Sequence, residues 1–326
     1  MSMFRGGEEM FNGVENDDRV VQPDPVLPLH KPGMKMCINV LVAGRPNYLY
    51  IALDSIFRNT VFNPESENVP DVFLYIDKLS SGESYASEVL KAASDFPLDG
   101  IFINKEHKGT VSNYWTSFDR AFADGYDFCI LLEEDWLITT NALQWLYDVP
   151  KIATNYSVYR WTDRMDHDDL QYYDEFCLDE EFNGVKYTRL KHGMYVAWCL
   201  AFEAGGYKFI QDIIKANGHW GIYKRPVRDV PMPEIRRTSY IDWDRTIINI
   251  LEFYGLLSIA PPESYLAHFG CKTSNYMGYG SGVNRHEQIF DGPKESWLDN
   301  VIQVFRETDH EEKTHLHLYP LRFEYR

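Results

Sequence analysis

Three consecutive carboxylates, Glu133, Glu134 and Asp135, directly follow a run of five apolar residues at 128–132. A run of this kind indicates a strand that is buried on both faces of a sheet. Carboxylates that end such a strand can hold a divalent cation, because Mg²⁺ and Mn²⁺ prefer oxygen ligands and leave positions open for phosphate. Ligands of open α/β sheets also bind at this edge. The alternative is an acidic turn that precedes a helix.

The segments that must position these carboxylates alternate between strands and helices. Apolar runs predict strands over residues 37–43, 72–76, 100–103 and 127–132. Helical spacing of apolar residues predicts the intervening helices over 48–58, 83–94 and 110–124. Such alternation indicates an α/β fold with a mixed, mostly parallel central sheet flanked by helices. Beyond about residue 140 the pattern predicts a strand over 195–202 and helices over 140–147, 206–216 and 243–254.

Composition excludes several classes of protein. The chain has 326 residues, of which 44% are hydrophobic, so it can bury a large core in one domain or in two closely joined domains. Its net charge of −17 opposes binding to nucleic acid or to an anionic membrane surface. An anionic ligand must therefore be met by local cations or by a metal.

The location of the protein is predicted from its apolar segments and its cysteines. No window approaches about 18 uninterrupted apolar residues, so we expect no integral membrane segment. The five cysteines are scattered without a CxxC pair, which is typical of buried thiols in a reducing compartment. The sequence therefore predicts a soluble protein of the cytoplasm.

Six short segments resemble, in their order and spacing, those of the GT-A nucleotide-sugar glycosyltransferases: VLVAGRPNYLYIALDSIFRNT, VFLYIDK, YDFCILLEEDW, YVAWCLAF, DWDRTIINIL and PPESYLAHFGCKTSNYMG. They are most similar to the inverting family 2 and N-acetylglucosaminyltransferase I-like type. The resemblance implies a Rossmann-like GT-A fold and a metal-dependent transferase. Such an enzyme moves a hexose or N-acetylhexosamine from a nucleotide sugar, with UDP as the nucleotide, to a glycan or other hydroxyl acceptor. Golgi enzymes of this type have a long membrane anchor and stem, which we do not expect for this chain, and this departure argues against a Golgi role.

The pattern along the chain also divides it into parts, which the resemblance names. Residues 1–35 are predicted to be an extended N-terminal arm, and residues 36–287 the GT-A catalytic domain. Within that domain, residues 36–140 correspond to the nucleotide-binding half and residues 141–287 to the acceptor half. Residues 288–326 are predicted to form a C-terminal helix and tail.

The acidic triplet resembles the DxD-type motif of the family, with the departure that Glu stands at the second position. The resemblance implies that Asp135 is the direct ligand of Mn²⁺ or Mg²⁺, that Glu134 faces ribose or a metal-bound water, and that Glu133 lies near the transferred sugar. His268 is a further candidate metal ligand, although a structural role is equally compatible with its position. The metal would neutralise the diphosphate as it leaves.

Three other residues are candidates for donor binding. Arg45 follows the first predicted strand, and the resemblance implies that its guanidinium approaches the phosphate or base of the nucleotide. Asp77 ends the second predicted strand and would accept the imide N–H of uracil. Lys272 lies close enough in sequence to His268 to contact the diphosphate. The alternatives are a solvated turn arginine and a carboxylate that caps a turn.

Two acids at the start of a predicted helix are candidates for the general base. An inverting transfer needs one carboxylate that takes the proton from the acceptor hydroxyl as its oxygen attacks the anomeric carbon. The resemblance assigns this base to the start of the helix over 243–254. We favour Asp244, with Asp242 second. The alternative is that these acids only cap the helix and interact with its dipole.

A glycine- and tyrosine-rich stretch over 273–282 is predicted to be a lid. Its composition is typical of a mobile loop, and the family has a loop here that orders over the donor and excludes water. Trp136 and Trp198 are candidates for stacking on a sugar ring, with core packing as the more common role for such residues.

Two other classes of protein share some of these features. A nucleotide-sugar pyrophosphorylase would use the same sheet and metal chemistry, but it needs a glycine-rich basic loop where this chain has VAGRPNY. A catalytically inactive module that binds nucleotides or carbohydrates is the other alternative, and the acids at 135 and 244 argue against it. Turnover of a nucleotide-sugar donor would separate these classes.

Overall fold

The computed structural model describes residues 34–62, 66, 69–79, 81–82, 84–149, 153, 155–157, 177–190, 200–216, 247, 250–251, 254, 256–262, 265–269 and 289–307. The described strands form a nine-stranded sheet in the order β3-β2-β1-β4-β9-β6-β10-β8-β7, and a two-stranded sheet of β11 and β5. The predicted α/β class with a mainly parallel central sheet flanked by helices is confirmed.

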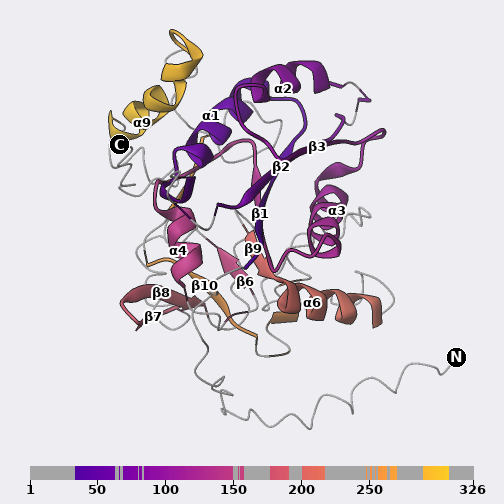
Figure 1. The fold of residues 1–326 in the computed structure, drawn as a ribbon, viewed down its shortest axis with the longest axis vertical. Coiled ribbons are helices and arrows are strands. Elements are labelled where there is room, and N and C mark those ends of the chain that lie inside the picture. The colour runs from indigo at the N-terminus through magenta and orange to yellow at the C-terminus, as the bar shows by residue number, and fades with distance from the viewer. Residues whose placement is uncertain are drawn as a thin grey trace, which may run out of the picture.

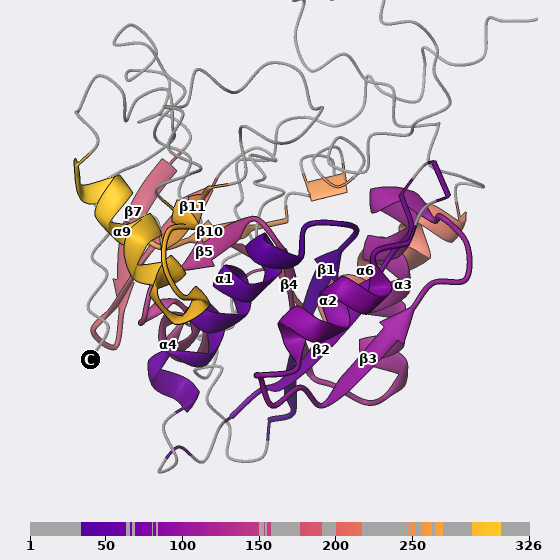
Figure 2. The same cartoon turned by 90° about the horizontal axis from the view of Figure 1, so that it is seen from above.

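Four parallel strands make up one end of the large sheet, which Figure 2 shows with β3 at its extreme. β1 (Met36–Val42) lies between β2 (Asp71–Ile76) and β4 (Phe128–Glu133), and β3 (Gly100–Ile103) lies beyond β2. Every residue of β1 is buried, as expected for a strand covered on both faces. The chain runs from β1 to β2 to β3 and then returns to the other side of β1, so the strand order reverses between β1 and β4.

The other end of the large sheet is mostly antiparallel. Strand β9 (Leu200–Glu203) pairs antiparallel with β4, and β6 (Asn155–Ser157) pairs antiparallel with β9. Strand β10 (Ser258–Ala260) joins β6 to β8 (Val185–Leu190). Because β4 pairs with β9, one sheet joins the segments before and after residue 140.

The hairpin of β7 (Cys177–Phe182) and β8 was absent from the sequence predictions. Its turn is Asn183-Gly184, where φ is 50° and 82°. Two consecutive positive φ angles define the tight turn that best matches the twist of paired strands, and glycine adopts such angles without strain. The Asn-Gly pair, a dipeptide that marks turns, was therefore a usable sequence signal for this hairpin.

Helices cover both faces of the parallel strands, as Figure 1 shows. Alternate residues of β1 point to opposite faces. Ile38, Val40 and Val42 pack on α1 (Pro46–Phe57), α2 (Ala86–Ala93) and α4 (Ala142–Asp148). Cys37 and Leu41 pack on α3 (Gly109–Ala123) and α6 (Ala204–Ala216). The two apolar layers fix the strands and hold their carboxyl ends at a common edge.

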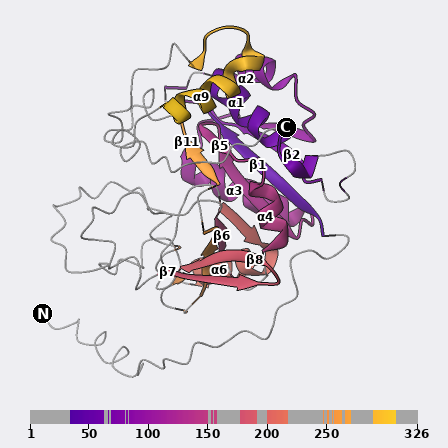
Figure 3. The same ribbon diagram turned by 90° about the vertical axis from the view of Figure 1, so that its left-hand side faces the viewer.

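Helix α9 (Trp297–Glu307) lies beside α1 on the outside of the molecule (Figure 3). The outer face of α1 carries Tyr48 and Ile51, which pack with Leu298 and Val301 of α9. The ring of Tyr48 also stacks on Phe269, with 5.1 Å between centroids and 9° between planes. Helix α9 and the two-stranded sheet thus share one apolar cluster with the start of α1.

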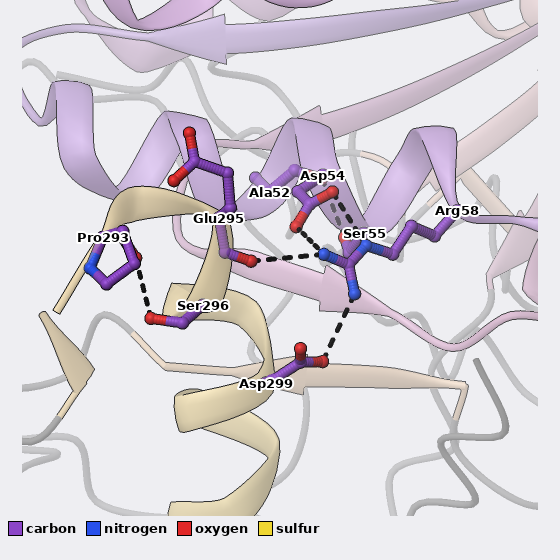
Figure 4. Close-up of polar contacts among 8 residues, drawn as sticks. All are labelled: Ala52, Asp54, Ser55, Arg58, Pro293, Glu295, Ser296 and Asp299. Carbon is purple, nitrogen blue, oxygen red and sulfur yellow. Dashed lines mark hydrogen bonds and ion pairs between the residues drawn. The ribbon is translucent and has the colours of Figure 1, made fainter. Parts of the chain in front are cut away.

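Polar contacts extend this packing at the C-terminal end of α1 (Figure 4). The guanidinium of Arg58 donates from Nε to Asp54 Oδ1 at 2.9 Å, and its Nη2 lies 2.8 Å from Asp54 Oδ2. Nη1 donates to Asp299 Oδ1 of α9 at 3.3 Å. Asp299 is exposed, so this part of the network is screened by solvent and adds little to stability.

The remaining elements are η1 (Thr60–Phe62), β5 (Trp136–Ile138), β11 (Leu266–His268) and η3 (Lys294–Ser296). The predicted strands and helices before residue 140 match the structure to within a few residues. The strand predicted over 195–202 is described from Leu200. The helix predicted over 243–254 is described only at residues 247, 250, 251 and 254. Within the described part of the chain, no helix combines the length and the apolar character that crossing a membrane requires.

Candidate functional site

The candidate site lies at the carboxyl edge of the parallel strands, where β1 and β4 separate. Glu133 ends β4, and Glu134 and Asp135 form the turn that follows it. Arg45 comes from the turn between β1 and α1, next to β4. This is the point at which the strand order reverses, and ligands of open α/β sheets bind at such a point. Arg45, Glu134 and Asp135 therefore meet where a ligand is expected.

Arg45 pairs with both buried carboxylates of the triplet. Its Nε donates to Glu134 Oε1 at 2.8 Å, and its Nη1 lies 2.8 Å from Asp135 Oδ2. The backbone of Arg45 is the N-cap position of α1, with Pro46 as the first helical residue. Proline suits this position because its fixed φ matches the helix and it has no N–H to leave unpaired. The start of α1 therefore holds the backbone of Arg45 where its guanidinium can reach Glu134 and Asp135.

The electrostatics of the triplet are dominated by burial. Glu134 and Asp135 are each only 5% exposed. Burial raises the pKa of Glu134 to about 7, with Asp135 adding to the rise and Arg45 opposing it. Burial lowers the pKa of Arg45, but the charges of Glu134 and Asp135 outweigh this and hold the pKa above its usual value. The site is thus a buried concentration of negative charge compensated by one internal cation.

Backbone contacts fix the two carboxylates in place. The N–H of Glu134 donates to Leu41 O of β1 at 3.1 Å, and the N–H of Phe269 donates to Asp135 O at 3.1 Å. Strand β11 pairs antiparallel with β5, so that His268 stands opposite Trp136. The backbone of His268 is thereby held next to the triplet, whereas its side chain lies outside the described residues.

Glu133 has a different environment from its neighbours. The hydroxyl of Tyr114 in α3 donates to Glu133 Oε1 at 3.0 Å. Tyr114 is 3% exposed and belongs to the apolar layer beneath the sheet. The sequence predicted a helix at this position but offered no signal that singled out Tyr114 as a partner of the triplet.

The donor set of the triplet fits a divalent cation. Oxygen ligands suit Mg²⁺ and Mn²⁺, and sites that act on phosphates use one or two carboxylates together with water and substrate oxygens. Glu134 and Asp135 are buried carboxylates that pair with the guanidinium of Arg45, so a cation is stabilised at this position. Among the side chains that the structure describes, no group of three or more His, Cys, Asp or Glu forms a complete metal site.

Asp77, at the end of β2, accepts hydrogen bonds from the turn before α3. Its Oδ1 accepts from the N–H of Lys108 at 3.0 Å and from Asn104 Nδ2 at 3.1 Å. Its Oδ2 accepts from the N–H of Gly109 at 2.9 Å. Gly109 has a φ of 73°, a left-handed conformation that glycine adopts without strain. Asp77 therefore stabilises the start of α3, and its predicted contact with uracil stays a prediction.

We expect Asp77→Asn to reduce the free energy of unfolding by about 2–3 kcal/mol. Hydrogen bonds to a charged acceptor contribute about 1.5–3 kcal/mol, and the substitution replaces one acceptor oxygen by an amide donor that faces backbone N–H groups. Urea unfolding would measure the loss. Asp99→Asn is the matched control, because Asp99 Oδ2 accepts one bond, from the N–H of Val72 at 2.7 Å, and is exposed. Equal losses in both variants would contradict the role assigned to Asp77.

Several predicted site residues lie outside the described residues. These are Asp242, Asp244, Lys272, Trp198 and the loop 273–282. Trp136 is described, is 4% exposed and belongs to the main apolar cluster, so it is a core residue in this structure.

A separate cavity of about 420 Å³ lies between α4, the β7–β8 hairpin and the segment before β11. Among the residues that line it are Gln144, Trp145, Lys186 and Tyr265. The N–H of Thr139 donates to Tyr265 O at 2.9 Å. Thr139 directly follows β5, at the end of that strand away from Asp135. Among the described residues, none of the candidate site residues that the sequence predicts lines this cavity, so it is separate from the site at the acidic triplet.

No protein-family model matches the chain, and no curated protein matches it by sequence. Among solved structures, it is similar to a mannosyltransferase from Pyrobaculum calidifontis in complex with GDP-Man and Mn²⁺. The sequence identity is 13%, the match covers 90% of this chain and 71% of the other, and the TM-score is 0.45. The apo glycosyltransferase GlyE of Streptococcus pneumoniae TIGR4 gives 10% identity over 87% and 62% of the two chains, and a TM-score of 0.41.

A third similar structure is a nucleotide-diphospho-sugar transferase of Desulfovibrio desulfuricans G20. It shows 13% identity over 71% of this chain and 80% of the other, with a TM-score of 0.34. Since all three TM-scores are below 0.5, these likenesses assign the chain to no family. The functional argument therefore rests on the residues of the site.

Proposed function

We propose that the chain is a metal-dependent inverting glycosyltransferase that moves a sugar from a UDP-linked donor to a hydroxyl of a glycan or other acceptor. The observation that carries the proposal is the meeting of Arg45, Glu134 and Asp135 at the edge where β1 and β4 separate. Buried carboxylates and an arginine at this edge match the needs of a metal–diphosphate complex. The order of the sequence segments that resemble GT-A enzymes supports the same reading.

The donor half of the site needs positive charge, because the chain carries a net charge of −17 and the donor is anionic. Asp135 would bind the metal directly, Glu134 would lie against it or against ribose, and His268 is a further candidate ligand. When bound, the metal supplies Lewis-acid stabilisation of the diphosphate leaving group. Arg45 and Lys272 would contact the diphosphate oxygens, and Asp77 the base.

The acceptor half of the site needs a base. Asp244, with Asp242 as the second candidate, would take the proton from the acceptor hydroxyl while its oxygen attacks the anomeric carbon. The bond between that carbon and the diphosphate oxygen breaks on the opposite face, so the configuration inverts. The proton stays on the carboxylate, and the negative charge leaves with the diphosphate. Residues 273–282 would close over the donor and exclude water.

The two alternatives predict different products. A pyrophosphorylase would form a nucleotide sugar from a sugar phosphate and a nucleoside triphosphate, and would release pyrophosphate. A binding module would hold nucleotide and turn over no donor. The sequence VAGRPNY, which stands where a pyrophosphorylase needs a glycine-rich basic loop, favours transfer over pyrophosphorolysis.

A panel of nucleotide sugars tests the proposal. The purified protein is incubated with UDP- and GDP-linked sugars in MnCl₂, and released nucleoside diphosphate is measured, with EDTA as the control. We expect metal-dependent release from at least one UDP-linked sugar, by hydrolysis when no acceptor is present. Release that EDTA does not reduce would remove the metal from the proposal. Formation of a nucleoside triphosphate when pyrophosphate is added, or an absence of turnover despite nucleotide binding, would favour one of the alternatives.

A further inference from the structure

The guanidinium of Arg45 occupies the position at which the proposed function requires a metal. Its Nε and Nη1 each lie 2.8 Å from an oxygen of Glu134 or Asp135, the two most deeply placed acids of the triplet. Both acids are 5% exposed, so an uncompensated charge on either would be costly. We propose that Arg45 is an exchangeable internal cation, which holds these carboxylates while the metal is absent and is displaced when a divalent metal binds. This inference rests on the proposed function, since it needs a metal site at the triplet.

The two cations cannot share the same oxygens. A Mg²⁺-sized ion bonds to carboxylate oxygens at about 2.0–2.1 Å, within the space that the guanidinium nitrogens of Arg45 now fill at 2.8 Å from Glu134 Oε1 and Asp135 Oδ2. Like charges at such separation repel strongly in a buried site. Metal binding at Asp135 Oδ2 therefore requires Nη1 of Arg45 to release that oxygen, and Arg45 lowers the apparent metal affinity.

The exchange requires movement of a side chain alone. The backbone of Arg45 is tied to α1, because its carbonyl accepts the N–H of Leu49 at 3.0 Å. The carboxylates are fixed from the other side by the backbone bonds of Glu134 to Leu41 and of Phe269 to Asp135. The Arg45 side chain is 27% exposed, whereas those of the two acids are below 10%, so its guanidinium has a route to solvent that the acids lack.

The exchange would also deliver Arg45 to the donor. A guanidinium released from the triplet stays at the carboxyl end of β1, because its backbone cannot leave the start of α1. Planar guanidinium groups bind phosphate oxygens in a bidentate manner. Metal loading would therefore place both the metal and the Arg45 guanidinium beside the diphosphate. In this arrangement Arg45 binds donor only after metal has bound.

Arg58 provides a matched control on the same helix. It pairs with Asp54 at 2.8 Å and has a side-chain exposure of 33%, close to that of Arg45, but it lies at the far end of α1 (Figure 4). Arg58→Gln therefore removes a comparable arginine–carboxylate pair without touching the triplet. An effect that Arg45→Gln shows and Arg58→Gln does not is therefore caused by the loss of the contacts with Glu134 and Asp135.

The experiment measures binding of MnCl₂ alone at pH 8, without nucleotide, by calorimetry, and the melting temperature with and without MnCl₂. For Arg45→Gln we expect Mn²⁺ affinity to rise at least about tenfold, the scale of a lost charged hydrogen bond. Its melting temperature should fall without Mn²⁺ and recover when Mn²⁺ is added. Arg45→Lys keeps the positive charge but loses the bidentate geometry of the guanidinium. Its Mn²⁺ affinity should lie between that of the unaltered protein and that of Arg45→Gln. Arg58→Gln should bind Mn²⁺ as the unaltered protein does.

The outcomes separate the exchange from the metal site itself. Equal Mn²⁺ affinity in the unaltered protein and in Arg45→Gln would overturn the exchange and leave the metal site standing. Weaker affinity in Arg45→Gln would mean that Arg45 supports the metal instead of competing with it. Absence of Mn²⁺ binding in both proteins would overturn the exchange together with the metal site of the proposed function. Arg45→Lys decides the question if Arg45→Gln does not fold.

Discussion

Asp135→Asn is expected to lower the Mn²⁺-dependent affinity for the nucleotide-sugar donor at least about 100-fold while the protein stays folded. Changes to residues that only support a metal ligand already cost about 10- to 100-fold in metal affinity, so loss of the direct ligand should cost at least as much. Asparagine keeps the shape of the side chain, and Arg45 retains its pair with Glu134 at 2.8 Å. Calorimetric titration of donor with and without MnCl₂ measures the effect.

Asp54→Asn is the matched control for this substitution. Asp54 is a partly buried carboxylate paired with an arginine on α1, as Asp135 is, but it lies at the helix end away from the triplet. It should change stability without changing donor affinity. A donor affinity in Asp135→Asn that still depends on Mn²⁺ to the usual extent would show that the metal is held elsewhere.

Asp244→Asn is expected to reduce sugar transfer by at least about 100-fold and to leave donor affinity unchanged. Removal of a general base typically costs 10²–10⁴-fold in rate, since the acceptor hydroxyl must then attack without losing its proton to the enzyme. An amide cannot accept that proton, but it has nearly the same size and should not disturb the donor half of the site. Transfer rates and donor affinities would be measured on the same preparations.

Asp242→Asn serves as the neighbouring control for the base. If Asp242→Asn is the inactive variant and Asp244→Asn is active, the base is Asp242. If both variants transfer sugar at the usual rate, the single-displacement mechanism proposed for this chain is wrong.

The sequence predicted the fold where apolar residues follow a regular strand or helix pattern. The segments that form β1 to β4 and α1 to α3 have apolar runs and helical spacing that leave little choice, and each was predicted to within a few residues, whereas the three-residue β5 was not predicted. The later strands β6 and β10 have three residues each, and such lengths carry no period that a sequence can show. The β7–β8 hairpin was missed although Asn183-Gly184 marks it.

The candidate site was predictable in its residues but not in its internal contacts. Arg45 was expected to face a nucleotide, whereas in the structure it pairs with Glu134 and Asp135. That pairing depends on β4 lying directly beside β1, and strand order cannot be deduced from the pattern of either strand. Asp77 likewise gains its partners from the turn before α3, about 30 residues further along the chain, because β3 lies next to β2.

The packing of α9 against α1 has a consequence for synthesis of the chain. Arg58 and Asp299 are separated by 241 residues, and the apolar face around Tyr48 and Ile51 is covered by Leu298 and Val301. During translation the parallel strands and their helices emerge first, and domains begin to fold as they leave the ribosome. The outer face of α1 nevertheless has no α9 to cover it until the 241 residues that separate Arg58 from Asp299 have been made. A nascent chain therefore carries an exposed apolar surface at the helix that presents Arg45 until α9 emerges and completes the packing.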